Sequence, residues 1–126
     1  MKKILFLAGA AALLATPAFA DLASELSTAQ THAGMASTQT DIAMVHKHLQ
    51  HAINCLVGPN GKGFDAAAGN PCGKAGNGAI PDSTNAAQKA KLTSIADTAE
   101  AGVKDSDLAA SQKVAKETAD AVAAAK

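Results

Sequence analysis

Three of the four histidines of the chain lie in one six-residue stretch, at His46, His48 and His51, and Cys55 follows four residues later. Apolar residues recur around them at helical spacing, so this stretch is expected to be an amphipathic helix. Steps of four, three and four residues bring four side chains onto one stripe of that helix, those of Met44, His48, His51 and Cys55. His46 points to another side. Imidazole and thiol groups gathered on one stripe are ligands that copper, nickel and zinc accept.

The length of the stripe limits how many of these groups can bind one ion. His48 and Cys55 are seven residues apart, which is about 10.5 Å along a helix axis, whereas ligands lie about 2.0–2.3 Å from an ion. A single site is therefore expected to combine His48 and His51 as core ligands with a donor from elsewhere. Cys72 is the best outside candidate, because its loop follows the end of this helix. His32 fits less well, although it could support a second site of the Met/His type.

Cys55 and Cys72 are also the only two cysteines, and a disulfide between them is the simpler prediction. Disulfides are common in exported proteins, and a closed loop of about seventeen residues stabilises a fold by roughly 3 kcal/mol in the chain-entropy model. If the disulfide forms, neither cysteine is a metal ligand, and the histidines could be ordinary residues at the edge of the core. Met35 and Met44 are likewise more ordinary as packing residues than as ligands of a soft metal.

The first twenty residues have the three parts of a cleavable secretory signal peptide. Lys2 and Lys3 precede an apolar run over residues 4–15, and an Ala-x-Ala end follows at residues 18–20. The apolar run has about twelve residues, fewer than the roughly twenty that a membrane-spanning helix needs. We therefore expect a periplasmic or secreted protein, cleaved after Ala20, with no stable membrane anchor.

Removal of the predicted signal peptide leaves 106 residues, the length of one domain. Loss of two of the eleven lysines leaves nine against eleven acidic residues, a formal charge of −2, with no arginine and Phe64 as the single aromatic residue. Nucleic acid is therefore not an expected partner, because neither a basic surface nor a stacking platform is present. Large apolar residues are few and alanine is abundant. Helices of this kind bury little area, so the fold gains from a disulfide, a metal or a partner.

The apolar periodicity predicts an all-α fold, a small up-down four-helix bundle made of two helical hairpins. Related Ala-Gly steps at residues 33–34 and 101–102 indicate two similar hairpins, each turning just after its glycine. A loop rich in Gly, Pro and Asn joins the hairpins over residues 58–82. The alternative to the first hairpin is one continuous helix over residues 22–56, about 50 Å long. The domain is expected to span residues 21–126, with helices at 22–36, 40–57, 83–102 and 106–125.

Residues 31–34 (Thr-His-Ala-Gly) and 45–52 (Val-His-Lys-His-Leu-Gln-His-Ala) resemble the His-Ala helical hairpins of small metal-binding proteins of the bacterial periplasm. The resemblance implies an exported four-helix bundle that binds divalent or copper ions through histidines, which here are His32, His46, His48 and His51. The second predicted hairpin has no histidine, and the cysteine-bearing loop is not part of that pattern. The resemblance therefore supports the predicted fold more than it supports the binding of metal ions.

The leading functional hypothesis is a non-enzymatic protein that binds or buffers copper, nickel or zinc, with accessory ligands at His46, His32 or Met44. The alternative is a disulfide-stapled structural or protein-interaction module of the periplasm that has no ligand. Haem is a weaker candidate cofactor: the C-x-x-C-H motif of covalent haem is absent, which leaves only noncovalent binding between helices. The chain also lacks an H-E-x-x-H motif and the spacing of a phosphate-binding loop, so we do not expect an enzyme.

Overall fold

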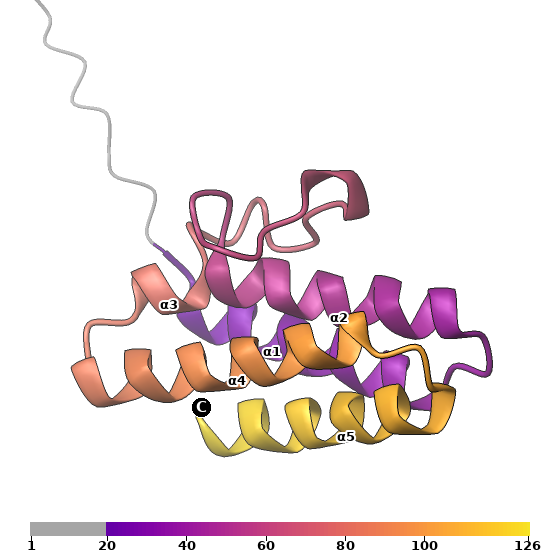
Figure 1. Ribbon diagram of the computed structural model, residues 1–126. Helices are drawn as coiled ribbons and strands as arrows, with labels where there is room; N and C mark the ends of the chain where they lie inside the picture. Colours follow the sequence, from indigo (N-terminus) through magenta and orange to yellow (C-terminus); the bar gives the residue numbers. More distant parts are fainter. Residues whose placement is uncertain (1–19) are drawn as a thin grey trace, which may run out of the picture.

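The computed structural model describes residues 20–126, which form a set of long helices with an extended loop beside them (Figure 1). The predicted signal peptide covers residues 1–20, and all of it except Ala20 lies outside the described residues. The all-α prediction is confirmed, because the described residues form five α-helices and one 3₁₀ turn and contain no strand. The elements are α1 (Leu22–Thr38), α2 (Ile42–Val57), η1 (Ala66–Ala68), α3 (Ala79–Asp82), α4 (Ala86–Lys104) and α5 (Leu108–Ala124).

Each of the four long helices begins at a side chain that caps its free backbone N–H groups. An oxygen of this side chain accepts hydrogen bonds from backbone N–H groups two or three residues further on. Such a cap is typically worth about 1 kcal/mol, because these N–H groups have no partner within the helix. The caps therefore fix where the helices start, and they are Asp21 for α1, Asp41 for α2, Asn85 for α4 and Asp107 for α5.

α1 and α2 are separate helices, which rules out the alternative of one continuous helix over residues 22–56. The turn does not follow Gly34 directly, since α1 continues to Thr38. α4 likewise continues past Gly102 and ends at Lys104. Both glycines are therefore accommodated within helices, and the two turns lie a few residues later than their Ala-Gly steps predict.

The long helices pack around α2. α1 contacts α2 and α5, α4 contacts the same two helices, and α2 also contacts α5. The core between them combines a small number of large apolar side chains with alanines that allow close approach. The largest contribution of fully buried aliphatic side chains comes from α2, with Val45, Leu49, Ile53 and Leu56.

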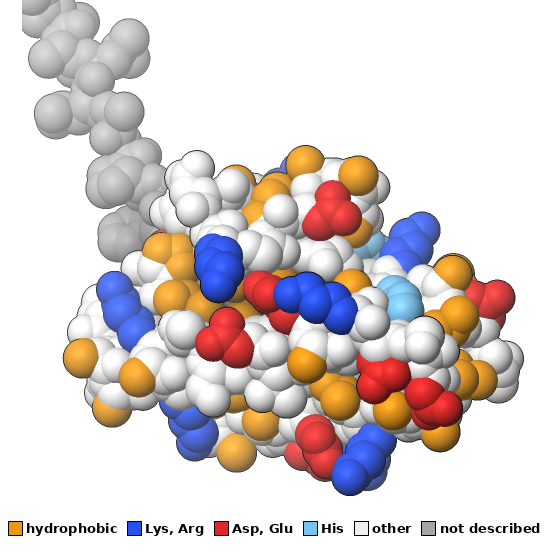
Figure 2. Space-filling view, viewed as in Figure 1, with side chains coloured by type: hydrophobic (Ala, Val, Ile, Leu, Met, Phe, Trp, Pro, Cys, Tyr) orange, Lys and Arg blue, Asp and Glu red, His pale blue; other side chains and the backbone are white. Residues whose placement is uncertain are grey.

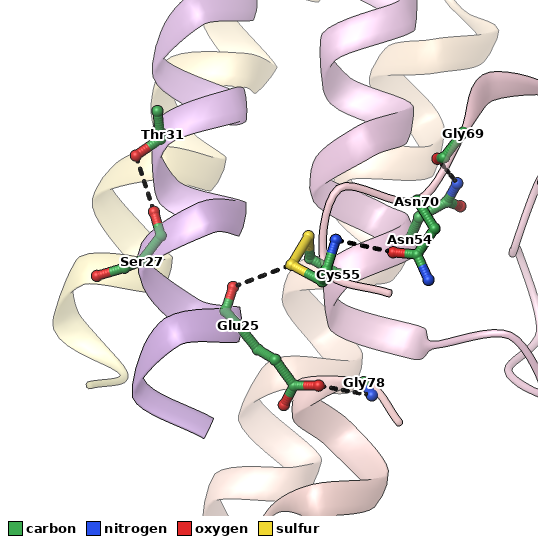
Figure 3. The surroundings of a disulfide bond; sticks show 9 residues. Glu25, Ser27, Thr31, Asn54, Cys55, Gly69, Asn70 and Gly78 are labelled. Atoms are coloured by element: carbon green, nitrogen blue, oxygen red, sulfur yellow. Dashed lines mark hydrogen bonds between the residues drawn. A yellow bond between two sulfur atoms is a disulfide. The ribbon is translucent and has the colours of Figure 1, made fainter. Parts of the chain in front are cut away.

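The predicted disulfide between Cys55 and Cys72 is confirmed, with the two sulfur atoms 2.04 Å apart and both residues buried. It joins the last turns of α2 to the long segment that connects α2 with α4, as Figure 3 shows around Cys55. This segment is not loop throughout, since η1 and α3 lie within the predicted loop 58–82. It starts at Gly58, whose φ of +72° favours glycine and whose backbone packs directly against that of Gly78.

Two glycines within helices test how tightly this core is packed. A Cβ atom on Gly102 would lie 2.7 Å from Cγ1 of Val114 and 3.0 Å from Cδ1 of Leu49, whereas one on Gly34 would meet no atom within 4 Å. Alanine favours a helix over glycine by up to about 1 kcal/mol, so Gly34→Ala should raise the free energy of unfolding by up to that amount. Gly102→Ala should lower it by about 1–3 kcal/mol, because the branched Val114 side chain must move. Urea unfolding followed by circular dichroism measures both changes. An equal gain from the two substitutions would contradict the close packing at Gly102.

Candidate metal centre

Three histidine side chains from two helices meet between α1 and α2. His32 comes from α1, whereas His48 and His51 come from α2. One nitrogen donor from each ring can be chosen so that all three lie within 4.8 Å of one another. Within residues 20–126, this is the only group of three or more His, Cys, Asp or Glu side chains with such spacing. We call this group the histidine triad.

The short connection between α1 and α2 sets the register of the triad. Residues 39–41 join the two helices, so positions equally far from the centre of the turn face each other. His32 lies eight residues before Thr40 and His48 eight residues after it. The two Nδ1 atoms are accordingly only 3.3 Å apart. His51 follows His48 by about one turn on the same side of α2, and so joins the pair.

His51 is held in one tautomer by the long loop. Its Nε2 lies 2.6 Å from the carbonyl oxygen of Ala68 in η1, and because a carbonyl can only accept, Nε2 carries the hydrogen. Nδ1 therefore presents a lone pair, and this buried atom has no hydrogen-bond partner among the described residues. A histidine that donates one ring N–H to a backbone carbonyl and leaves the other nitrogen free has the usual arrangement of a metal ligand.

The separation of His32 and His48 also fits a bound ion. Two ligands of a tetrahedral ion, each about 2.0–2.1 Å from it, are roughly 3.3–3.4 Å apart. The two Nδ1 atoms lie 3.3 Å apart, where one can donate a hydrogen bond to the other when no ion is bound. The ring of His51 stands at 83° to that of His32 and at 79° to that of His48, so its plane is nearly perpendicular to both.

Burial favours the neutral form of two of the three imidazoles. The pKa of His32 is lowered mainly by its removal from water, and further by the nearby His51 and His48. The pKa of His48, which is only 9% exposed, is lowered by burial first, and then by His51 and Lys47. Neutral imidazoles have the free lone pairs that a metal ion requires. Protons and metal ions compete for the same nitrogens, and burial weakens the proton as a competitor.

The remaining predicted ligands on α2, His46 and Met44, are not members of the triad. Nε2 of His46 is 2.8 Å from the carbonyl oxygen of Asp105 and 3.5 Å from the hydroxyl of Ser111, so His46 joins α2 to the connection between α4 and α5. Met44 lies one turn before His48, and its side chain is 38% exposed.

The disulfide removes Cys55 and Cys72 from the set of ligands, because neither has a free thiolate. The expectation that Cys72 supplies the donor from outside the helix is therefore wrong, and His32 on α1 occupies that position. The signal that could have identified His32 is its distance from the turn, which matches that of His48. The role of Ala68 has no signal in the sequence, because any residue offers a backbone carbonyl.

Asn54 fixes the part of the loop that reaches His51. Its side-chain nitrogen donates to the carbonyl oxygens of Asp65 and Gly69, at 2.8 and 2.7 Å. Its side-chain oxygen accepts from the backbone N–H of Asp65 and from the side chain of Gln50. All hydrogen-bonding positions of this buried amide are thus used. Figure 3 shows Asn54 reaching Gly69 close to the disulfide.

A buried carboxyl group holds another part of the loop against α1. Oε1 of Glu25 accepts a hydrogen bond of 2.8 Å from the backbone N–H of Gly78, whereas its Oε2 is buried without a partner (Figure 3). Burial raises the pKa of Glu25 to about 7; the hydrogen bond from Gly78 opposes this rise and the charge of Asp82 adds to it. Asp82 accepts from the backbone and the side chain of Asn77. A proton on Glu25 therefore relieves the repulsion between two neighbouring carboxyl groups.

Charged side chains of both signs are interspersed over the face shown in Figure 2, and histidine side chains reach the surface among them. No helix within residues 20–126 combines the length and the apolar character needed to cross a lipid bilayer.

Comparison with protein-family models, with curated protein sequences and with solved structures finds no match to this chain. The histidine triad itself is therefore the basis for assigning a function.

Replacement of Glu25 by glutamine is expected to stabilise the protein at high pH. The unfolded chain loses this proton near the ordinary pKa of 4.5, whereas the folded protein keeps it up to about pH 7. The folded state therefore binds more protons in this window, and the stability of the wild-type protein falls as the pH rises through it, by at most about 3 kcal/mol. The glutamine side chain keeps an acceptor for Gly78 and does not ionise.

Urea unfolding near pH 5 and near pH 8 measures this effect. The free energy of unfolding gained by Glu25→Gln over the wild type should grow by about 2–3 kcal/mol between these two values. Glu117→Gln, at an exposed site on α5, is the matched control and should change stability by less than about 0.5 kcal/mol at either pH. A gain from Glu25→Gln that does not vary with pH would contradict the protonated state of Glu25.

Proposed function

We propose that this protein is an exported, non-enzymatic binding protein for a divalent transition metal or copper ion, with His32, His48 and His51 as ligands. The observation that carries the proposal is the free Nδ1 of His51. This atom is buried without a partner, and it belongs to a ring whose other nitrogen is fixed by a backbone carbonyl. The ring itself lies beside two more imidazoles. An ion supplies the partner that this nitrogen lacks.

The ligand chemistry favours copper, nickel or zinc. Imidazole suits these three ions, whereas calcium and magnesium prefer oxygen ligands and the triad offers none. Three neutral ligands leave the charge of the ion uncompensated and one tetrahedral position open for water or an exchangeable ligand. Reversible binding or buffering of the ion is the role that fits such a site.

Two features support a location outside the cytoplasm. The Cys55–Cys72 disulfide is typical of proteins in an oxidising compartment. The signal-peptide pattern of residues 1–20 predicts export to the same kind of compartment. We therefore place the protein in the periplasm or outside the cell, and we assign its four long helices to a bundle of two hairpins that presents the triad.

Thermal unfolding with and without added ions tests the proposal. Zn(II), Ni(II) or Cu(II) at about one hundred times its dissociation constant stabilises the folded state by about 2.7 kcal/mol, and for a domain of this size each kcal/mol raises Tm by roughly 4–8 °C. His51→Ala should abolish the rise, because it removes the ligand that the loop holds in place. His46→Ala is the matched control: it removes an imidazole from the same helix and should leave the metal-induced rise intact. Mg(II) should have no effect on any of the proteins.

Two results would contradict the proposal. The absence of a rise in Tm with all three transition ions would favour the alternative, a disulfide-stapled structural module whose histidines bind nothing. An undiminished rise in His51→Ala would place the ion elsewhere in the chain.

A further inference from the structure

Two methionines are the large apolar side chains that stay exposed in residues 20–126. Met35 on α1 is 41% exposed and Met44 on α2 is 38% exposed. The sequence-based expectation that these residues pack in the helical core is therefore wrong. Every other large apolar side chain of the described residues is buried or partly buried. An exposed methionine loses the stabilisation that burial gives, but its sulfur atom stays accessible to a metal ion.

The hairpin register places the two methionines beside the triad and on the same side of it. Met35 follows His32 by three residues and Met44 precedes His48 by four, and both spacings return to nearly the same face of a helix. Because the helices are antiparallel, both steps lead toward the turn, by about 4.5 Å on α1 and about 6 Å on α2. The contact between His32 and His48 fixes this register. The two thioethers therefore flank the seam between α1 and α2, one turn from the His32–His48 edge of the triad.

Thioether sulfur is a neutral, soft donor, which favours Cu(I) over zinc or nickel. Imidazole also binds copper, so the two kinds of donor are compatible in one site. We propose that Met35 and Met44, together with the His32–His48 edge of the histidine triad, form a binding site for monovalent copper. This inference rests on the proposed function of the triad and assigns copper to it as the ion. The methionine sulfur atoms add a preference for Cu(I), the reduced ion, whereas the imidazoles of the triad alone suit divalent ions.

The methyl resonances of methionine give a direct test. Ag(I), a monovalent soft ion that stays in one oxidation state, serves as the probe on protein labelled with ¹³C at the methionine methyl groups. Met35→Leu and Met44→Leu identify the two resonances, and leucine preserves both the helix and the apolar volume. One equivalent of Ag(I) should shift both resonances, and Zn(II) should shift neither. Ag(I) binding that leaves either resonance in place would overturn the proposed pair.

Competition with a chromophoric Cu(I) chelator under anaerobic conditions tests the energetic contribution. The double variant Met35→Leu/Met44→Leu should bind Cu(I) at least about tenfold more weakly than the wild type, a loss of about 1.4 kcal/mol, and should bind Zn(II) within about twofold of it. His46→Ala should match the wild type for both ions. Equal Cu(I) affinity in the wild type and the double variant would contradict the methionine site.

The two proposals can fail separately. Zn(II) binding by His51→Ala tests only the triad, because this variant leaves both methionines and the His32–His48 edge of the methionine site in place. A triad that binds Zn(II) while neither methionine responds to Ag(I) would refute the methionine site and leave the proposed function standing. Methionine shifts with Ag(I), without a rise in Tm from Zn(II), Ni(II) or Cu(II), would refute the divalent-ion site of the triad and leave the methionine site standing.

Discussion

The Cys55–Cys72 disulfide is the constraint on which the arrangement of the site depends. The core has few large side chains, and most of those on the long helices belong to α2, so packing alone offers little to hold the segment between α2 and α4. The disulfide anchors that segment one turn beyond His51, and Asn54 binds the same segment through its side chain. The carbonyl oxygen of Ala68 thereby reaches His51. The bond that stabilises a small alanine-rich fold thus also supports the histidine triad.

The triad, like the buried Oε2 of Glu25, departs from the hydrogen-bond satisfaction found in most of the described structure. Helix starts are capped, and the buried amide of Asn54 uses all its hydrogen bonds. Nδ1 of His51, in contrast, is buried without a partner, which costs about 1–3 kcal/mol in a folded protein. The pKa values of His32 and His48 are lowered in the same place. Local violations of this kind, surrounded by satisfied structure, are typical of binding sites, and one bound ion would satisfy all three rings.

Local signals explain which features the sequence could predict. The apolar period places α2 within two residues of its observed start, and the stripe on this helix correctly pairs His48 with His51. The disulfide could be predicted from two cysteines in a chain whose first residues have the pattern of a signal peptide. His32 is misplaced because a turn just after residue 36 would set it opposite Met44 rather than His48. The contacts of the long loop could not be predicted, since a segment rich in glycine has no period and its key groups, such as the carbonyl of Ala68, are backbone atoms.

X-ray absorption at the zinc edge, on protein loaded with one equivalent of Zn(II), identifies the ligands of the bound ion directly. We expect a first shell of nitrogen and oxygen at about 2.0–2.1 Å, with the outer scattering of three imidazole rings and no sulfur at about 2.3 Å. The same spectrum from His32→Ala should show one imidazole fewer, because His32 supplies the ligand from α1. A sulfur shell, or a first shell of oxygen without imidazole scattering, would contradict a site built from His32, His48 and His51.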